Sequence, residues 1–330
     1  MKIALDAMGG DHAPAAVVEG AVLAAKEYKD IQIILVGIQD KIERELRKYR
    51  PLPEGISVVH SSEVIEMDEP AATSMRKKRD SSITRGVELM KDSGVDAFVS
   101  AGNTGAVVCA ATLTLGLLPG IERPGIAIII PTLTGAALMI DVGANIDPKP
   151  SHLLQYAIMA SDYSHYVLNT LNPSVGLLNI GEEESKGTDF MKETHKLLSE
   201  RILNFVGNIE GKDIFSGKCD CIICDGFVGN VVLKVSESLV ETVIEFLKRE
   251  IKKNLLAKFG VVFMKTAFSG LKKQIDYAEY GGAPLLGIDG VVIICHGRSN
   301  AKAIKNAIKA AKKEVELDVN AHIIEKVKTI

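Results

Sequence analysis

The sequence of 330 residues contains no apolar run long enough to cross a bilayer. Its longest apolar run, residues 126–130, stops at Pro131, far short of the roughly 20 residues that a membrane-spanning helix needs. The N-terminus has no basic region followed by a long apolar stretch, so no secretory signal is visible. We therefore expect a soluble cytoplasmic protein, with attachment to a membrane surface left open.

Cysteine and net charge are also scarce. Five cysteines are an odd number in a long chain and do not form the pattern of a disulfide framework. A formal net charge of -3 argues against a nucleic acid as partner of the whole molecule. What remains is an ordinary globular composition, 47% hydrophobic and 25% charged, without repeats or Pro/Ser-rich linkers. It supplies enough core for one large unit or two lobes.

The familiar motifs of nucleotide and metal enzymes are missing as well. No G-x-G-x-x-G follows the first predicted strand, and neither G-x-S-x-G nor H-E-x-x-H occurs. Residues 181–188 hold Gly, Lys and Thr, but in an order that differs from the P-loop. The spacing of Cys219, Cys221 and Cys224 matches no common closed zinc site. We predict no cofactor and no metal.

Short runs rich in β-branched residues alternate with helical patterns along the whole chain. These runs are apolar on both faces, as strands covered by helices on both sides must be. The alternation predicts a three-layer α/β/α fold with a mixed, mostly parallel sheet of about ten strands. The predicted strands are residues 3–7, 31–38, 57–60, 97–101, 126–130, 137–142, 175–180, 205–209, 219–224 and 291–295.

Local signals refine this outline at three places. Pro14 suits the first position of a helix that continues to Tyr28. Ser81 and Ser82 are typical of a cap before another helix. The connection at residues 131–136 is too short for a crossover helix, so the strands on either side of it should be antiparallel.

Glycine-rich polar segments follow six of the predicted strands. Ligands of open α/β sheets bind beyond the carboxyl ends of the strands, so six such segments predict one shared polar cleft. The segments are residues 6–12, 100–106, 141–147, 179–187, 225–230 and 296–300, and another one, 280–287, precedes the last strand.

The most informative segment is SAGNTGA, residues 100–106. Its glycines Gly102 and Gly105 let the backbone approach a ligand, and Asn103 or Thr104 can cap the following helix. Free backbone N–H groups and the helix dipole then favour an anion. The alternative is a capped turn whose glycines serve close packing.

Two basic stretches stand out in an acidic chain. Residues 76–79 (RKKR) lie in a predicted polar loop, where they face an anionic substrate or partner or are simply solvated. Residues 248–273 mix lysines with apolar residues and contain one acid, Glu250. That mixture predicts an acidic protein partner, a membrane surface or both, and the alternative is an oligomer interface with a charged rim.

Seven motifs together carry a family resemblance: DAMGGDHAP at 6–14, SMRKKRDSS at 74–82, SAGNTGA at 100–106, DVGANIDPKP at 141–150, LLNIGEEESKG at 177–187, DGFVGNVVLK at 225–234 and YGGAPLLG at 280–287. From residue 1 to about 313 the chain resembles the bacterial phosphate acyltransferases of phospholipid synthesis, the PlsX family. Minor departures are Cys295, where the family often has Gly, and Cys219 and Cys221, at strand positions where aliphatic residues are expected.

The resemblance implies that a long-chain acyl group passes from acyl-acyl carrier protein to inorganic phosphate. The acyl-phosphate product then feeds a membrane glycerol-3-phosphate acyltransferase. The resemblance implies the fold of isocitrate dehydrogenases and phosphotransacetylases, with residues 1–330 as a single domain of two intertwined lobes sharing one sheet. It also implies a homodimer and a peripheral contact with the inner face of the cell membrane, which suits residues 248–273.

The implied chemistry needs few specialised residues. Phosphate near pH 7 is already an anionic nucleophile, and a thiol with a pKa of about 8.5 is a fair leaving group. A phosphate cradle, donors for the developing oxyanion and accurate placement are sufficient. Lys186, in a loop flanked by glycines, is the candidate mobile cation, and the resemblance supports this role. The alternative is a solvated lysine after three glutamates.

The first polar segment is expected to serve the same reaction. Gly9 and Gly10 make room for substrate, while Asp6 or Asp11 orients His12, which binds phosphate or passes a proton to the thiolate. Alternatively, Asp11 caps the next helix and His12 is a spectator. The predicted catalytic residues are therefore Lys186, His12 and Asp11. The predicted substrate and phosphate-binding residues are Gly9, Gly10, Arg76, Ser100, Gly102, Asn103, Thr104, Gly105, Asp141, Asn145, Asn230, Gly281 and Gly282, of which Asp141, Asn145 and Asn230 are expected to lock neighbouring loops.

Three rival functions fit parts of the same pattern. A phosphotransacetylase acting on short acyl-coenzyme A would differ in its acyl donor. A dehydrogenase of the same fold is disfavoured by the missing cofactor motif. A non-enzymatic sensor would bind an acyl thioester and leave it intact in the presence of phosphate.

Overall fold

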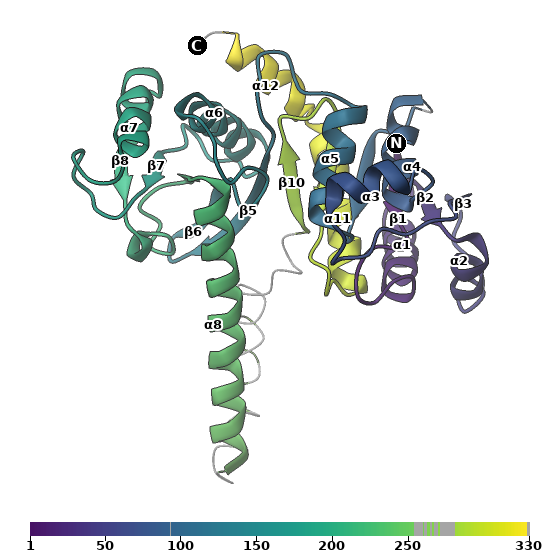
Figure 1. Cartoon of the computed structure of the whole chain (residues 1–330). Helices are drawn as coiled ribbons and strands as arrows, with labels where there is room; N and C mark the ends of the chain where they lie inside the picture. Colours follow the sequence, from purple (N-terminus) through teal and green to yellow (C-terminus); the bar gives the residue numbers. More distant parts are fainter. Residues whose placement is uncertain are drawn as a thin grey trace.

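The computed structural model describes residues 1–92, 94–253 and 281–328, together with Gly260, Phe263, Met264, Thr266 and Gly270. Within these residues one mixed sheet of eleven strands runs through the whole molecule. Figure 1 shows β1, β2 and β3 on one side of the central strand β10 and β5 to β8 on the other. The strands are β1 (Lys2–Asp6), β2 (Gln32–Gly37), β3 (Ile56–His60), β4 (Ala97–Ser100), β5 (Gly125–Thr132), β6 (Gly135–Ile140), β7 (Val175–Leu178), β8 (Phe205–Ile209), β9 (Cys221–Ile223), β10 (Ala283–Leu286) and β11 (Val291–Ile294).

Helices cover both faces of the sheet. They are α1 (Ala15–Glu27), α2 (Gln39–Leu46), α3 (Ala71–Lys77), α4 (Ser82–Asp92), α5 (Thr104–Thr114), α6 (Pro150–Tyr166), α7 (Asp189–Arg201), the 3₁₀ helix η1 (Gly211–Asp213), α8 (Gly226–Lys253), α11 (Ala301–Glu316) and α12 (Val319–Val327). In the N-terminal half, alternate residues of β1 pack on opposite faces because strand side chains alternate. Ile3 and Leu5 pack with α1 and α11, whereas Ala4 packs with α4 and α5.

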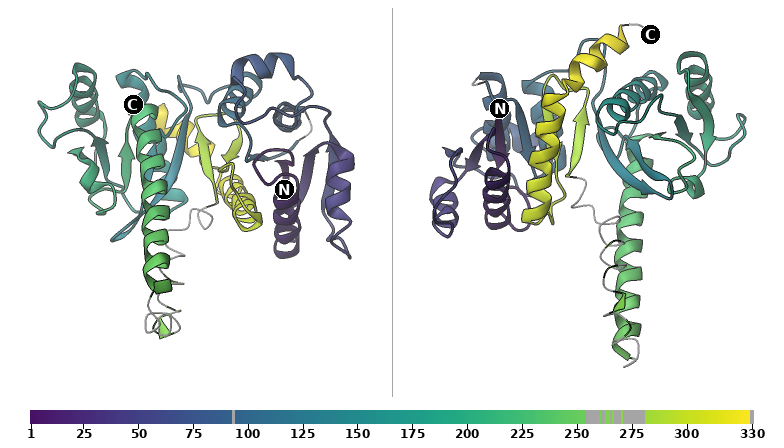
Figure 2. Two further views of the ribbon diagram at one scale, coloured as in Figure 1. Left: turned by 60° about the horizontal axis from the view of Figure 1, so that its bottom comes forward. Right: turned by 180° about the vertical axis from the view of Figure 1, so that it is seen from behind.

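The last two helices join the two halves of the molecule. Helix α11 packs against α1 and β11 in the N-terminal half, whereas α12 packs against α6 in the other half. Figure 2, viewed from behind, shows this pair running along the join between the halves. The hydroxyl of Tyr163 on α6 donates to the carboxyl of Glu314 on α11 at 3.0 Å. The halves are therefore held together by buried polar contacts as well as by the sheet.

The direction of the strands reverses between the two halves. The order is β3-β2-β1-β4-β11-β10-β5-β6-β9-β7-β8, and the pairs β11/β10, β10/β5 and β5/β6 are antiparallel while the others are parallel. Strands β1, β4 and β11 therefore end at one edge of the sheet, and β6, β9 and β7 end at the opposite edge. The polar segments that follow these strands therefore start from opposite edges of the sheet.

The ten predicted strands are all present, and the antiparallel pair around residues 131–136 is confirmed by the register Ala127 to Ile140. The predicted helix starts are also close, since α1 begins at Ala15 and Ser81 Oγ accepts from the backbone N–H of Thr84 at the start of α4. The predicted fold class, a mixed and mostly parallel α/β sheet, is confirmed.

Three local predictions were wrong. Strand β10 escaped prediction because it is short, contains Pro284 and follows two glycines. It pairs its first two residues with β11 and its last two with β5. Residues 76 and 77 belong to helix α3 instead of a polar loop. Strand β9 begins at Cys221, so Cys219 precedes it.

Helix α8 differs from the other helices because most of it lies outside the body of the protein (Figure 1). Among its 28 residues, Gly226 and Gly229 are the buried ones. Val235, Leu239 and Phe246 expose 60%, 61% and 60% of their surface, and their spacings of four and seven residues, about one and two helical turns, place them along one side of the helix. Residues 248–253 end this helix, and most of the predicted stretch 248–273 lies outside the described residues. No helix in the described part of the chain is long and apolar enough to span a membrane.

Candidate active site

A cavity of about 340 Å³ lies where the two halves meet. One part of its wall is apolar and comes mainly from β5, β10 and β11, while the other part is polar and comes from the segments that follow strands. The apolar lining is Ile126, Ile128, Ile129, Val142, Leu233, Ala283, Ile294 and Cys295. The polar lining includes Thr104, Asn230, Lys234, Glu237, His296 and Ser299. The cavity thus combines surface for a hydrocarbon with donors for an anion.

The start of helix α5 supplies one polar part of this wall. Asn103 is the N-cap, and its side-chain oxygen accepts from the backbone N–H of Ala106 at 3.0 Å. Thr104 and Gly105 line the cavity, and no described residue accepts a hydrogen bond from their backbone N–H groups. These N–H groups and the helix dipole favour a negatively charged ligand.

The amide of Asn103 is used by the protein itself. Its nitrogen donates toward the carbonyl oxygens of Glu66, Met67 and Glu69, at 3.1, 3.2 and 2.9 Å. The side chain therefore caps α5 and fastens the segment before α3. The next residue, Thr104, lines the cavity, whereas Asn103 does not.

A second polar group of the cavity consists of His296, Lys234 and Glu237. The Lys234 ammonium donates to Glu237 at 3.2 Å, and Nε2 of His296 lies 3.5 Å from Lys234 Nζ and 3.7 Å from Glu237 Oε2. The backbone N–H of Arg298 donates to Nδ1 of His296 at 3.0 Å. Burial lowers the pKa of His296 below its usual range, against the opposing effect of Glu237.

The segment at residues 6–12 supports the cavity from behind. The carboxylate of Asp6 is buried and accepts from Ser100 Oγ at 2.7 Å, and Ser100 Oγ accepts from the N–H of Gly102 at 3.0 Å. Burial raises the pKa of Asp6, although its hydrogen bonds oppose the shift. A Cβ at Gly9 would lie 2.5 Å from the backbone nitrogen of Gly102. Gly9 therefore makes room for the neighbouring loop instead of a ligand.

Gly10, Asp11 and His12 lie beside the loop after β11. Gly10 has a φ of +97°, and a Cβ there would lie 2.9 Å from the carbonyl oxygen of Gly297. The N–H of Asp11 donates to that same oxygen at 2.8 Å. Asp11 and His12 are exposed and are not among the lining residues of the cavity. The alternative that Asp11 caps α1 is wrong, because the N-cap is Pro14 and no side chain caps this helix.

Asp141 and Asn145 organise the loop after β6. The buried carboxylate of Asp141 accepts from the N–H groups of Ile126, Gly143 and Ala144 at 2.9–3.0 Å and of Asn145 at 2.7 Å. The Asn145 amide donates to the carbonyl oxygen of Pro124 at 2.6 Å and to the hydroxyl of Tyr156 at 2.7 Å. Burial raises the pKa of Asp141 despite these donors. The geometry is that of a loop held in place by the Asp141 carboxylate and the Asn145 amide nitrogen.

Asn230 and the glycines before β10 lie nearer the ligand space. The amide of Asn230 donates to the carbonyl oxygen of Val142 at 3.1 Å, and Asn230 also lines the cavity. Gly281 and Gly282 have φ of +82° and +92°, a region that favours glycine. Gly282 lines the cavity, whereas a Cβ at Gly281 would lie 2.4 Å from the carbonyl oxygen of Asn306.

Lys186 lies apart from this cavity. It is exposed in the loop between β7 and α7, in the half of the molecule formed by β5 to β8, and is not among the cavity-lining residues. Its loop is shaped by Asn179, whose amide donates to the carbonyl oxygen of Lys186 at 3.3 Å. Nearby, Glu182 pairs with Lys212 and Lys218 at 3.4 and 3.1 Å. The chain by itself does not bring Lys186 and the α5 start together.

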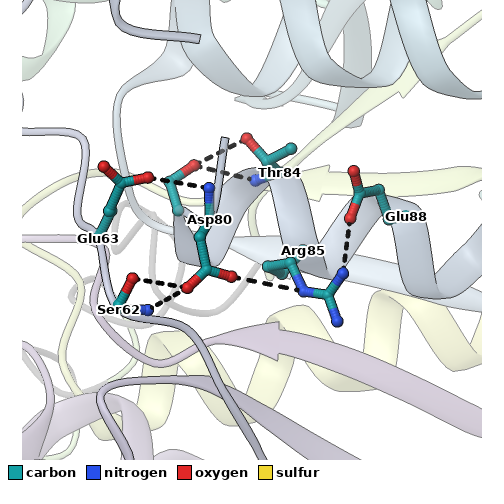
Figure 3. A network of polar contacts seen from close by, with 7 residues as sticks. Ser62, Glu63, Asp80, Thr84, Arg85 and Glu88 are labelled. Carbon is teal, nitrogen blue, oxygen red and sulfur yellow. Dashed lines mark hydrogen bonds and ion pairs between the residues drawn. The ribbon is translucent and has the colours of Figure 1, made fainter. Parts of the chain in front are cut away.

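Arg76 is also exposed, in the last turn of α3. The segments around α3 are fastened by a polar network shown in Figure 3. Asp80 accepts from the N–H and hydroxyl of Ser62 at 2.8 and 2.6 Å, and its own N–H donates to Glu63 at 2.9 Å. Arg85 lies 3.7 Å from Asp80 and 3.0 Å from Glu88. This network therefore holds in place the segment that follows the basic residues 76–79.

The cysteine thiols of residues 221 and 224 contact oxygen atoms of the protein. Cys224 Sγ donates to the carbonyl oxygen of Asp141 at 3.3 Å, and Cys221 Sγ lies 3.2 Å from the hydroxyl of Ser164. Burial raises the pKa of Cys219 and Cys221 to about 12. Among the described residues no group of three His, Cys, Asp or Glu side chains has a geometry that could hold a metal ion.

Sequence reasoning missed Lys234, Glu237 and His296 as site residues. The first two are spaced i and i+3 on a helix, a pattern that resembles an ordinary solvated ion pair. His296 belongs to the polar segment 296–300, which follows a buried strand. That position was the signal that could have identified it as a site residue.

Comparison with solved structures defines the class of fold. A phosphotransacetylase from Streptococcus pyogenes superimposes with a TM-score of 0.61 at 17% identity, covering 98% of this chain and 94% of that one. The EutD phosphotransacetylase from Staphylococcus aureus gives a TM-score of 0.59 at 15% identity, covering 95% and 94%. At these identities the likeness establishes the fold alone, which is that of the phosphotransacetylases.

The sequence comparisons are more specific. A family model described as fatty acid synthesis protein matches residues 1–322. The phosphate acyltransferase of Geotalea daltonii is 52% identical over 326 residues, covering 99% of this chain and 94% of that protein. The phosphate acyltransferase of Geobacter sulfurreducens is 50% identical over 329 residues, covering 100% and 95%. The chain belongs to this phosphate acyltransferase family.

Proposed function

We propose that the protein transfers a long-chain acyl group from acyl-acyl carrier protein to inorganic phosphate, giving acyl-phosphate for phospholipid synthesis. The observation that carries the proposal is the composition of the cavity. The start of α5, with Thr104 and Gly105, offers N–H groups to an anion, and the side chains of β5, β10 and β11 offer an apolar surface. Family membership supports phosphate and an acyl group as the two ligands.

The proposed reaction is balanced without an outside acid or base. An oxygen of HPO₄²⁻ bonds to the thioester carbonyl carbon, and the carbonyl oxygen takes up the negative charge. The carbon–sulfur bond then breaks, and the proton that phosphate loses ends on the leaving thiolate. The chain's contribution is to place the two reactants and to stabilise the developing oxyanion.

Lys186 and His12 remain the proposed mobile cation and proton carrier. Lys186 is exposed on its loop, and His12 is exposed beside the loop after β11 that carries His296. For either to act on the proposed substrates, its loop must approach the cavity when they bind. Arg76, on the exposed face of α3, is proposed to attract the anionic substrate.

The partners of the proposed function are acyl carrier protein, a second copy of the chain and a membrane surface. Helix α8 supports the last two, because its exposed apolar side is followed by Lys248, Arg249, Lys252 and Lys253. An apolar stripe with basic neighbours suits an interface with a charged rim or an anionic lipid surface. The proposed membrane contact is made by residues 248–273. It would bring the protein close to the downstream glycerol-3-phosphate acyltransferase, which is a membrane enzyme.

The test is an assay of acyl donors. Purified protein is incubated with phosphate and palmitoyl-acyl carrier protein, palmitoyl-coenzyme A or acetyl-coenzyme A, and acyl-phosphate is trapped with hydroxylamine. Phosphate-dependent product from the carrier-protein thioester is the expected result. Product from acetyl-coenzyme A alone would identify a phosphotransacetylase, and tight binding without product would identify a sensor.

A further inference from the structure

His296 is held in one tautomer by the backbone. The N–H of Arg298 donates to Nδ1 at 3.0 Å, and a ring nitrogen that accepts a hydrogen bond carries no proton. In the neutral ring the proton therefore sits on Nε2. A charged ring would carry a proton on Nδ1 as well, pointing at the N–H of Arg298. The same contact thus opposes the imidazolium form.

Nε2 of His296 and Nζ of Lys234 form a pair of donors inside the cavity. They lie 3.5 Å apart, and both residues line the cavity. Because Nε2 carries the ring proton, it does not accept a hydrogen bond from Lys234. One oxygen atom placed between the two nitrogens can accept from both. Glu237, which accepts from Lys234 at 3.2 Å, holds the ammonium in place.

We propose that the Nε2–H of His296 donates to the carbonyl oxygen of the acyl thioester as it becomes an oxyanion, with the Lys234 ammonium as second donor. This inference rests on the proposed function and names the groups that stabilise its charged intermediate. Donors fixed before the reaction stabilise developing charge most effectively in a site shielded from water. A neutral imidazole keeps its proton, so the oxygen retains the charge that expels the thiolate.

The position of the donor pair fits the other parts of the cavity. Thr104 and Gly105 at the start of α5 remain available for phosphate, and the side chains of β5 remain available for the acyl chain. Burial, which lowers the pKa of His296, keeps the ring neutral near pH 7. His296 acts on the carbonyl oxygen, and phosphate binding is assigned to other groups.

The test compares His296→Ala with His296→Gln, whose amide retains an N–H donor. The alanine variant should lower kcat about 100-fold, the usual loss of one oxyanion donor, and leave the KM for phosphate within about twofold. The glutamine variant should recover at least about tenfold of that loss. Unchanged kcat, a rise confined to the KM for phosphate, or no recovery with glutamine would each overturn the proposal.

Two controls separate the possible failures. His60→Ala removes another histidine that accepts a backbone N–H through Nδ1, from Gln39 at 3.3 Å, outside the cavity, and its activity should match the wild type. If the wild type forms no acyl-phosphate from any donor, the proposed function fails, independently of His296.

A spectroscopic measurement on the wild type covers the case in which the variants do not fold. ¹⁵N NMR of histidine-labelled protein reports the protonation of both ring nitrogens. At pH 7 we expect His296 to be neutral with its proton on Nε2. A proton on Nδ1, or on both nitrogens, would overturn the proposed role.

Discussion

The loops after β6 and β11 each place a titratable side chain directly behind a buried central strand. Behind β6, the carboxylate of Asp141 accepts four backbone N–H groups, three of them from its own loop. After β11, Nδ1 of His296 accepts from the N–H of Arg298, and its Nε2 lies near Lys234 and Glu237, which line the cavity with it. Two similar positions thus differ, since one side chain holds the backbone and the other lines the cavity.

The same division separates adjacent residues at the start of α5. The side-chain amide of Asn103 caps α5 and donates to the segment before α3, whereas Thr104 lines the cavity. In both places the number of polar atoms already used by the protein distinguishes a supporting residue from a candidate ligand-binding residue. Three of the predictions below test this division and one tests the join between the halves, in order from the largest expected effect to the smallest.

Replacing Asp141 should have the largest effect on stability. Asp141→Ala leaves four backbone N–H groups without their acceptor, and each buried unsatisfied donor costs about 1–3 kcal/mol. We expect a loss of at least about 3 kcal/mol in the free energy of unfolding, measured with urea. Asp141→Asn, which keeps one acceptor oxygen, should lose less. An Asp141→Ala protein as stable as the wild type would show that the carboxylate does not hold the loop.

Glu314 should make the join between the halves sensitive to pH. Burial raises its pKa to about 8, far above the value of an exposed glutamate near 4.3. The folded protein therefore binds the extra proton, so the stabilising contribution is complete below about pH 4 and is lost as the pH rises through 8. Between pH 5 and pH 8 we expect stability to fall by on the order of 3 kcal/mol relative to Glu314→Gln. Parallel pH profiles for the two proteins in urea unfolding would refute this.

Lys186 and His12 test the boundary of the active site. If their loops approach the cavity during turnover, Lys186→Ala and His12→Ala should each reduce kcat ten-fold or more, typical of a lost charge or acid–base group. Because both side chains are exposed, thermal unfolding should be nearly unchanged. Full activity in a folded variant would remove that residue from the mechanism and leave the cavity residues alone responsible.

The smallest effects should separate Asn103 from Thr104. Asn103→Ala removes a helix cap, which alone costs about 1 kcal/mol, and the amide donor to residues 66–69, so stability should fall by at least about 1 kcal/mol. Thr104→Ala should leave stability within about 0.5 kcal/mol and raise the KM for phosphate a few-fold, because its side chain faces the cavity. A reversal of these two phenotypes would contradict the assignment.

Strand positions, fold class and the Asn103 cap at the start of α5 were predictable from the sequence, because alternation and capping are local patterns. The missing strand β10 was not, since Pro284 and the preceding glycines hide a strand that pairs two residues with each neighbour. Nor could the sequence show that β6, β9, β7 and β8 run opposite to β1, β4 and β11, because this depends on the pairing of β10 with β11 and β5.

The roles of individual polar residues were predictable only in part. The sequence marks Asp6, Asp141 and Asn145 as unusual residues near strand ends, yet it does not reveal that their polar atoms are used within the protein. For Lys234 and Glu237 the sequence misleads in the opposite direction. Their spacing looks like that of a surface ion pair, and only the structure shows that they line the cavity beside His296.

The most direct test of the account is the location of bound phosphate. Crystals grown with arsenate, a phosphate analogue with an anomalous signal, would show where the anion binds. The account predicts a site at the start of α5, in contact with Thr104 and Gly105, in the cavity that also contains His296. An anion bound only at the loop of Lys186, with the cavity empty of it, would contradict the account.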